Sequence, residues 1–133
     1  MPRPKQTTPT PAELEVLQLL WDQGPATVRQ VMEQLSAQRP RGYTSVMSLM
    51  EVMHQKGLLR RESQGRAYLY DARVDQSKTL GQMLGDLLRR AYHGSSTALV
   101  SHLLEHAAPD EDELREIRRV IKAHERREEK QRR

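Results

Sequence analysis

The chain has 133 residues, 36% of them apolar, with one Trp and no Phe, so it can bury one small core but not a large one. Lys and Arg number 22 against 18 Asp and Glu, and the resulting net charge of +4 does not by itself indicate a polyanionic partner. The absence of Cys excludes disulfides and thiolate metal sites. No apolar run approaches a membrane span or a signal peptide, so we expect a cytoplasmic protein without membrane insertion.

The N-terminal part predicts an arm followed by a helix. Residues 1–9 are polar and Pro-rich, which is typical of a flexible arm. The tetrapeptide TPAE at 10–13 then supplies an N-capping threonine, a proline in the first helical position and the glutamate of a capping box. We expect this helix to end at Gly24-Pro25.

Two further helices follow with the same kind of signal. Thr27 and Gln30 form the second predicted capping box, ahead of an apolar face at helical spacing. After a break at residues 39–42, a third helix begins at Tyr43 or Thr44 and ends at Gly57, in the position of a C′ glycine. Its inward face is predicted to be Val46, Leu49, Met50 and Met53. The opposite face carries Thr44, Ser45, Met47, Ser48 and Glu51.

The stretch RRESQGRAYLY at 60–70 predicts a β-hairpin. Gly65 can adopt the positive φ of a turn, and residues 67–70 alternate with the period of a strand, which leaves Arg66 at the tip. Tyr68 and Tyr70 fit half-buried strand positions better than base-stacking positions. Three short helices followed by a hairpin is the order of a winged helix-turn-helix, whose third helix enters the major groove of DNA and whose hairpin contacts the neighbouring backbone or minor groove.

Positive charge is concentrated in this same region. Seven cations and three anions lie between Arg39 and Arg73, so this segment carries the whole net charge of +4. A clustered basic patch is the electrostatic signature of phosphate binding, and small hydroxyls beside Met47 suit contacts with base edges and thymine methyl groups. We therefore predict double-stranded DNA as partner. The alternative is a winged-helix adaptor that binds protein, which would not need the patch.

Three amphipathic helices are predicted after residue 74. The first ends before Gly94, Ser95 or Ser96 caps the second, and Asp110 caps the third. Their apolar stripes cannot all be buried within one small chain, so we predict that residues 74–128 form an intertwined homodimer and that 129–133 are a disordered tail. The predicted dimerisation residues are Leu80, Met83, Leu84, Leu87, Leu88, Leu99, Leu103, Leu114, Ile117 and Ile121.

Other functional classes find little support in the residues. No nucleophile–base–acid arrangement and no phosphate-cradling glycine loop is present, so we expect no enzymatic activity. His102 and His106 are spaced i, i+4 as metal ligands can be, but no third ligand accompanies them, so no metal or cofactor is predicted. A histidine-based, metal-responsive repressor remains an alternative.

Six motifs in order resemble the penicillinase-repressor family of BlaI, MecI and CopY types: TPAE with the following VLQLLW, ATVRQV, YTSVM, KGLLRRE, GRAYLY and GSSTALVSHLLEH. The resemblance runs from about Thr8 to about Ala123. It implies a mainly α fold with a small hairpin wing, in which a winged helix-turn-helix at 10–73 precedes the dimerisation helices. It also implies a homodimeric repressor on a pseudo-palindromic operator. In the family, a membrane-bound sensor protease often relieves repression through cleavage in the C-terminal region.

The resemblance also assigns roles to residues. Base reading maps to Tyr43, Thr44, Ser45, Met47 and Ser48. The wing contact maps to Arg66, phosphate binding to Thr27, and the cleaved bond to His102-Leu103. Without Cys, the thiolate motif of the copper-responsive branch is missing. Together with cations of the basic patch, the predicted DNA-binding residues are Thr27, Arg41, Tyr43, Thr44, Ser45, Met47, Ser48, Lys56, Arg61 and Arg66.

Overall fold

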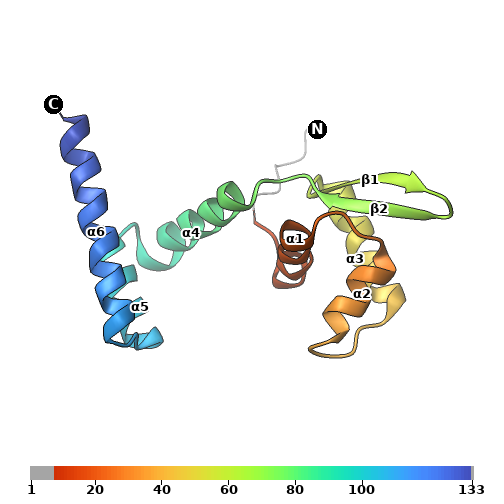
Figure 1. Cartoon of the computed structure of the whole chain (residues 1–133), viewed down its shortest axis with the longest axis horizontal. Coiled ribbons are helices and arrows are strands. Elements are labelled where there is room, and N and C mark those ends of the chain that lie inside the picture. Colours follow the sequence, from red (N-terminus) through yellow and green to blue (C-terminus); the bar gives the residue numbers. More distant parts are fainter. Residues whose placement is uncertain (1–7, 133) are drawn as a thin grey trace. The chain divides into compact units, whose positions relative to one another are not determined.

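The computed structural model describes residues 8–132, in which six helices and one two-stranded sheet follow one another along the chain (Figure 1). The elements are α1 (Pro11–Gln23), α2 (Val28–Ser36), α3 (Tyr43–Lys56), β1 (Leu59–Gln64), β2 (Ala67–Ala72), α4 (Gln76–Tyr92), α5 (Ser96–Ala107) and α6 (Glu111–Gln131). Residues 1–7 of the predicted arm lie outside the described residues. Of the rest of the arm, Pro9 is buried. The chain divides into two units after Asp86, and each is described by itself.

The first helices begin with the predicted capping boxes. The Thr10 hydroxyl accepts from the Glu13 amide at 3.2 Å, and the Thr10 amide donates to the Glu13 carboxylate at 2.9 Å. Thr27 and Gln30 repeat this reciprocal pair at 3.2 and 2.9 Å. Both satisfy backbone donors that a helix N-terminus leaves free. The two predicted helix starts are therefore confirmed.

The core of the first unit lies between the three helices and the hairpin. Helix α3 packs against both α2 and β1, and α1 contacts α2, α3 and β2. Apolar residues at helical spacing meet the inward side of the hairpin there, as expected for a buried face. Leu49 was predicted to belong to this face but lies only partly buried at its margin. The buried core residues are Val16, Leu17, Leu20, Ala26, Val28, Val31, Leu35, Val46, Met50, Met53, Leu58, Leu59 and Tyr70.

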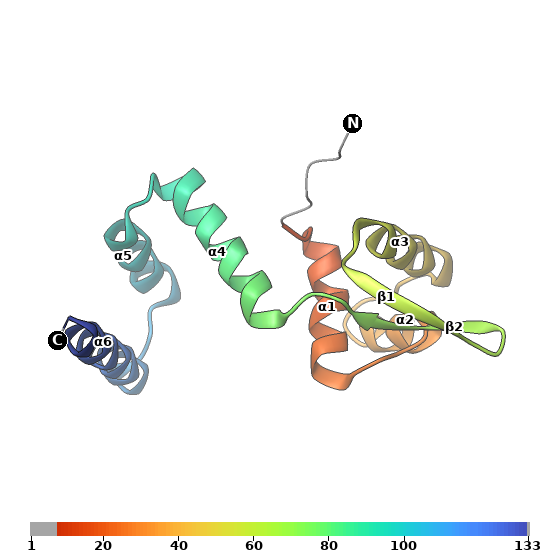
Figure 2. The ribbon, with the colours of Figure 1, turned by 90° about the horizontal axis from the view of Figure 1, so that it is seen from above.

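The predicted hairpin is present as an antiparallel pair. Leu59 pairs with Ala72 at the base and Gln64 with Ala67 at the turn, where Gly65 has a φ of 62°. Ala26 forms an isolated antiparallel bridge with Tyr70 and so adds a minimal third strand position beside β2. Figures 1 and 2 show the turn at the end of the hairpin that lies farthest from α1. These elements form a winged helix-turn-helix in a mainly α protein, as predicted.

The first turns of α4 are held to the winged-helix elements. The Trp21 indole N–H donates to the Val74 carbonyl at 2.9 Å, and Thr79 is buried. Asp75 accepts from the Lys78 amide at 2.9 Å and thereby caps the helix start. The division between the two units lies within α4, after Asp86, whereas the sequence analysis expected the winged-helix domain to end at residue 73.

Helices α5 and α6 begin at the predicted caps. Ser95 accepts from the Ala98 amide at 3.1 Å, and Asp110 accepts from the Glu113 amide at 2.8 Å. Helix α6 continues to Gln131, whereas a disordered tail was predicted from residue 129. The difference follows from helix-favouring Glu, Lys and Arg residues and from i, i+4 contacts such as His124–Glu128 at 3.6 Å. Within residues 8–132, no helix is both long and apolar enough to cross a membrane.

Candidate nucleic-acid interface

The outward face of α3 carries the predicted base-reading side chains. Because Val46, Met50 and Met53 are buried, the helical period turns the intervening positions toward solvent. The structure places on this exposed face all five predicted members, which are Tyr43, Thr44, Ser45, Met47 and Ser48. Short hydroxyls can donate and accept hydrogen bonds with base edges, and the Met47 side chain offers an apolar contact.

A hollow of about 470 Å³ adjoins this face between α3, the start of α2 and the wing. It brings together predicted residues that are far apart in the sequence, and it also contains aromatic and acidic side chains. The positive end of α2 and the side chains of Arg29 and Arg66 line this hollow, so the region beside them suits an anion. Its lining is Thr27, Val28, Arg29, Tyr43, Met47, Glu51, Arg66, Ala67, Tyr68 and Tyr70.

Arg29 belongs to this hollow although the sequence interpretation missed it. Its guanidinium carbon lies 5.5 Å from the centroid of the exposed Tyr43 ring, a cation–π arrangement. Arg29 stands ten residues before the predicted basic patch, so a count along the chain does not include it. Its place in the first turn of the capped helix is the signal that could have identified it, because this turn adjoins the predicted phosphate site at Thr27.

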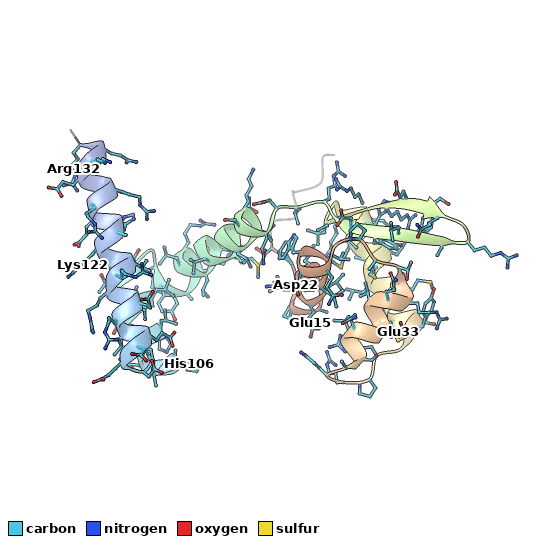
Figure 3. All side chains as sticks on the ribbon, viewed as in Figure 1. Glu15, Asp22, Glu33, His106, Lys122 and Arg132 are labelled. Carbon is cyan, nitrogen blue, oxygen red and sulfur yellow. The ribbon has the colours of Figure 1, made fainter. Side chains whose placement is uncertain are left out.

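Arg41 does not lie free on the interface. Its side chain is only 11% exposed, and its guanidinium donates to the Glu15 carboxylate at 3.1 Å. This hydrogen bond lowers the pKa of Glu15, and the positive charges of Arg41 and of Arg39, which lies 4.0 Å from Glu15, lower it further. Glu15 of α1, labelled in Figure 3, thus holds the loop that precedes α3.

Lys56 is likewise engaged within the protein. Its ammonium donates to the Glu13 carboxylate at 2.7 Å, and Glu13 itself is only 2% exposed. A buried carboxylate needs such a partner, because an unpaired buried charge is strongly unfavourable. Lys56 therefore joins the end of α3 to the start of α1.

Arg61 is enclosed by three side chains. It forms an ion pair with Glu51 of α3, donates to the Tyr70 hydroxyl at 3.1 Å, and lies 4.0 Å from the centroid of the Tyr68 ring. The hydrogen bond to Tyr70, followed by the one to Glu51, raises the pKa of Arg61. Its charge is therefore paired with Glu51, and its guanidinium lies against the two tyrosines of β2.

Carboxylates of α1 reduce the net charge around the predicted basic patch. Glu13 and Glu15 come from outside the Arg39–Arg73 segment, so counting them lowers its net charge from +4 to +2 (seven cations, five anions). Arg60 is also paired, with Asp71 at 3.1 Å. Within residues 8–132, Arg66 and Arg73 are the cations of this segment without an ion-pair partner. Available positive charge is therefore centred on Arg66 at the wing tip.

None of the ten predicted dimerisation residues is fully buried within the single chain. Leu84 and Leu103 are each 54% exposed, and no residue of α5 or α6 is buried. Leu80, Leu87 and Ile121 are also exposed, whereas Met83, Leu88, Leu99, Leu114 and Ile117 are partly buried. Figure 3 labels Lys122 in the middle of α6 and Arg132 just after its end.

His102 and His106 lie one turn apart on α5, with ring centroids 6.4 Å apart. His102 Nδ1 is 2.7 Å from the Tyr92 hydroxyl. Residues 8–132 contain no group of three or more His, Asp or Glu side chains placed to hold a metal ion. The His102-Leu103 bond lies in the middle of α5, in helical backbone with exposed side chains.

Comparison with known proteins relates most of the chain to a protein family. The model of the family described as "Penicillinase repressor" matches residues 9–123. "Transcriptional regulator BlaI" of Mycobacterium tuberculosis is 35% identical over 106 residues, which are 77% of each chain. "Penicillinase repressor" of Bacillus licheniformis is 24% identical over 113 residues, 85% of this chain and 88% of the relative. The solution structure of the DNA binding domain of the repressor BlaI matches with a TM-score of 0.49 and 24% identity, covering 59% of this chain and 93% of that one.

Proposed function

The chain belongs to the penicillinase repressor family, whose members are transcriptional repressors and not enzymes, and we propose that it represses transcription by binding double-stranded DNA as a homodimer. The observation that carries the proposal is the single exposed surface formed by α3, the start of α2 and the wing. A repressor acts on the chromosome, so we also propose a cytoplasmic location.

We assign base reading to the exposed face of α3. Thr44, Ser45 and Ser48 present hydroxyls, and Met47 presents a methyl group suited to thymine. The wing and the start of α2 would hold the DNA backbone through Arg66, Arg29 and the amides after Thr27. Arg41 and Lys56 have structural roles in this assignment, since carboxylates of α1 already bind both.

The proposed dimer rests on the uncovered apolar stripes of α4, α5 and α6. Large exposed apolar surfaces on a single chain indicate an interaction surface, and a second copy offers a matching one through two-fold symmetry. One recognition helix reads few base pairs, whereas two copies combine their base and phosphate contacts on a pseudo-palindromic operator. Dimerisation therefore sets the affinity for the operator.

We propose that repression ends when the C-terminal helices can no longer hold the dimer. Proteolysis by a membrane sensor system, with His102-Leu103 as the candidate bond, is one route, and another signal acting on these helices is the alternative. Protease substrates must be extended, so α5 would first have to unfold locally around this bond. Within a single chain α5 has no buried residues, so the free energy of such opening depends on what its apolar face contacts in the proposed dimer.

A salt titration of duplex binding tests the proposal. Each phosphate neutralised by the protein releases condensed cations, so the affinity for a labelled non-specific duplex should fall steeply as salt rises from about 50 to 200 mM. Fluorescence anisotropy with the purified full chain measures this. Binding that stays flat over this range, or no binding at low salt, would contradict the proposed DNA-binding function.

A further inference from the structure

Arg61 occupies a position between two parts of the proposed DNA-binding surface. It comes from β1, in the wing, while its ion-pair partner Glu51 comes from α3. Tyr70 is its cross-strand partner and Tyr68 lies two residues away on the same face of β2. The Arg61 guanidinium thus contacts α3 and both aromatic side chains of the wing.

The position of this contact along the hairpin matters. The base of the wing is fixed by the bridge of Ala26 with Tyr70, with backbone hydrogen bonds of 2.9 and 2.8 Å. Beyond it, every residue from 62 to 68 is exposed. Arg61 therefore lies at the boundary between the anchored base and the exposed outer half that carries Arg66.

Glu51 gives the contact a second consequence. It follows Met47 by four residues and Ser48 by three, so it shares the helix face of the proposed base-reading side chains. An unpaired carboxylate there would repel DNA phosphates. Its ion pair with Arg61 offsets this negative charge next to the hollow that both Glu51 and Arg66 line.

We propose that Arg61 is a positioning residue that clamps the wing to α3 through Glu51, Tyr68 and Tyr70, and that it does not itself bind a phosphate. The clamp keeps Arg66 at a fixed place relative to Thr44 and Ser45, so that backbone and base contacts are made together. This inference rests on the proposed DNA-binding function. It replaces the direct DNA contact predicted for Arg61 from the sequence.

Hydrogen exchange in the DNA-free protein tests the clamp. Arg61→Gln and Glu51→Gln should each speed exchange of the amides at 62–68 by about two- to five-fold, the range that partly exposed ion pairs and cation–π contacts give. The double variant should exchange no faster than Arg61→Gln alone, because both changes remove the same contact. Arg60→Gln is the matched control, since it removes the neighbouring cation, whose partner is Asp71 on the same hairpin.

Salt-dependent duplex binding separates the clamp from a phosphate contact. A positioning role predicts weaker binding by Arg61→Gln with an unchanged slope of log affinity against log salt, whereas a lost phosphate contact lowers that slope by about 0.9. Arg61→Lys, which keeps the charge but not the planar stacking group, should also speed exchange at 62–68 and keep the slope. It provides the test if Arg61→Gln does not fold.

The two hypotheses fail in different ways. Unchanged exchange in Arg61→Gln, exchange in the double variant faster than in Arg61→Gln, or a slope reduced by about 0.9 would overturn the clamp. If the parent protein fails to bind duplex, the proposed function is overturned. The assignment of Arg61 to positioning Arg66 for DNA is then overturned as well. The exchange comparison would then still show whether the wing is held by Glu51.

Discussion

At the scale of single residues, carboxylates on α1 and α3 determine which cations can meet a ligand. Glu15 holds Arg41, Glu13 holds Lys56, and Glu51 holds Arg61. The first two pairs join residues 26 and 43 positions apart, so neither can be identified from spacing along the sequence. The basic segment is visible in the sequence, but only the fold shows that carboxylates of α1 and α3 pair with much of its charge.

The pair between Glu15 and Arg41 should make the stability of the protein depend on pH. Because Arg41 lowers the pKa of Glu15 below its ordinary value of 4.5, the pair stabilises the folded state fully above that pH, and this contribution is lost as pH falls through the lower folded-state pKa. In urea unfolding, the free energy of unfolding of Glu15→Gln should therefore differ from that of the parent by a constant amount between roughly pH 5.5 and 7. The two values should converge below about pH 4.5.

Glu33→Gln is the control for this titration. Glu33 is an exposed carboxylate on α2, labelled in Figure 3, without an ion-pair partner among residues 8–132. It should leave both stability and its pH dependence nearly unchanged, since isolated surface charges contribute little. A Glu15→Gln difference that persisted unchanged at low pH would show that the carboxylate charge is not its source.

Residues of the wing and of α3 should affect DNA binding differently. Arg66→Ala should weaken binding to operator and non-operator duplexes by similar factors and reduce the salt slope by about one, because a wing tip contacts backbone. Thr44→Ala or Ser45→Ala should instead reduce the preference for the operator by about 1–3 kcal/mol if a base contact is lost. Competition binding with both duplexes measures the two effects. The reverse pattern would place base reading on the wing.

At the scale of elements, local sequence signals predicted most of the structure. Reciprocal capping at Thr10 and Thr27 starts α1 and α2, Gly57 with a φ of 88° ends α3, and Gly65 forms the hairpin turn. These signals act within a few residues, which is why they can be read from the sequence. The end of α6 was not predicted, because an all-charged segment gives no apolar periodicity and its helix depends on propensity and i, i+4 pairs.

The hairpin turn depends on the conformation of Gly65 and not on space around it. A methyl group at this position would meet no atom within 4 Å apart from the two neighbouring residues. The φ of 62°, however, is a left-handed conformation that costs L-residues about 1–2 kcal/mol. Gly65→Ala should therefore lower the free energy of unfolding by about 1 kcal/mol, after allowing for the reduced entropy of the unfolded chain. Urea unfolding measures the change.

Gly65→Asn is the informative companion to this variant. Asn tolerates the left-handed region better than Ala does, because its short polar side chain can form hydrogen bonds with the nearby backbone. It should retain more stability than Gly65→Ala. Equal losses in both variants would indicate that the side chain itself, and not the backbone angle, disturbs the turn.

At the scale of the whole molecule, the apolar stripes of the C-terminal helices make the dimer the central question. Leu87 of α4 is 48% exposed in the single chain. In a two-fold interface, Leu87→Asp would bury two unpaired charges, each costing several kcal/mol. Sedimentation should show that Leu87→Asp is a monomer. Circular dichroism should show that its winged helix is still folded. Its DNA binding should be lost at concentrations where the parent binds.

Gln82→Asp provides the matched control for that variant. It places the same charge on the same helix, at an exposed position on the side away from the stripe. It should remain dimeric and bind DNA like the parent. Should Leu87→Asp also remain dimeric, the stripe must be covered in another way, and loss of the dimer could not be the way in which repression ends.

Selection from a randomised duplex library tests the central proposal most directly, because it examines DNA reading and two-fold assembly in one measurement. The full chain is incubated with the library, and the bound duplexes are recovered and sequenced over several rounds. The proposed dimeric repressor predicts enrichment of a two-fold symmetric sequence, with half-sites centred about 10 base pairs, or a multiple of this, apart. No enriched sequence, or an unsymmetrical single site occupied by a monomer, would contradict it.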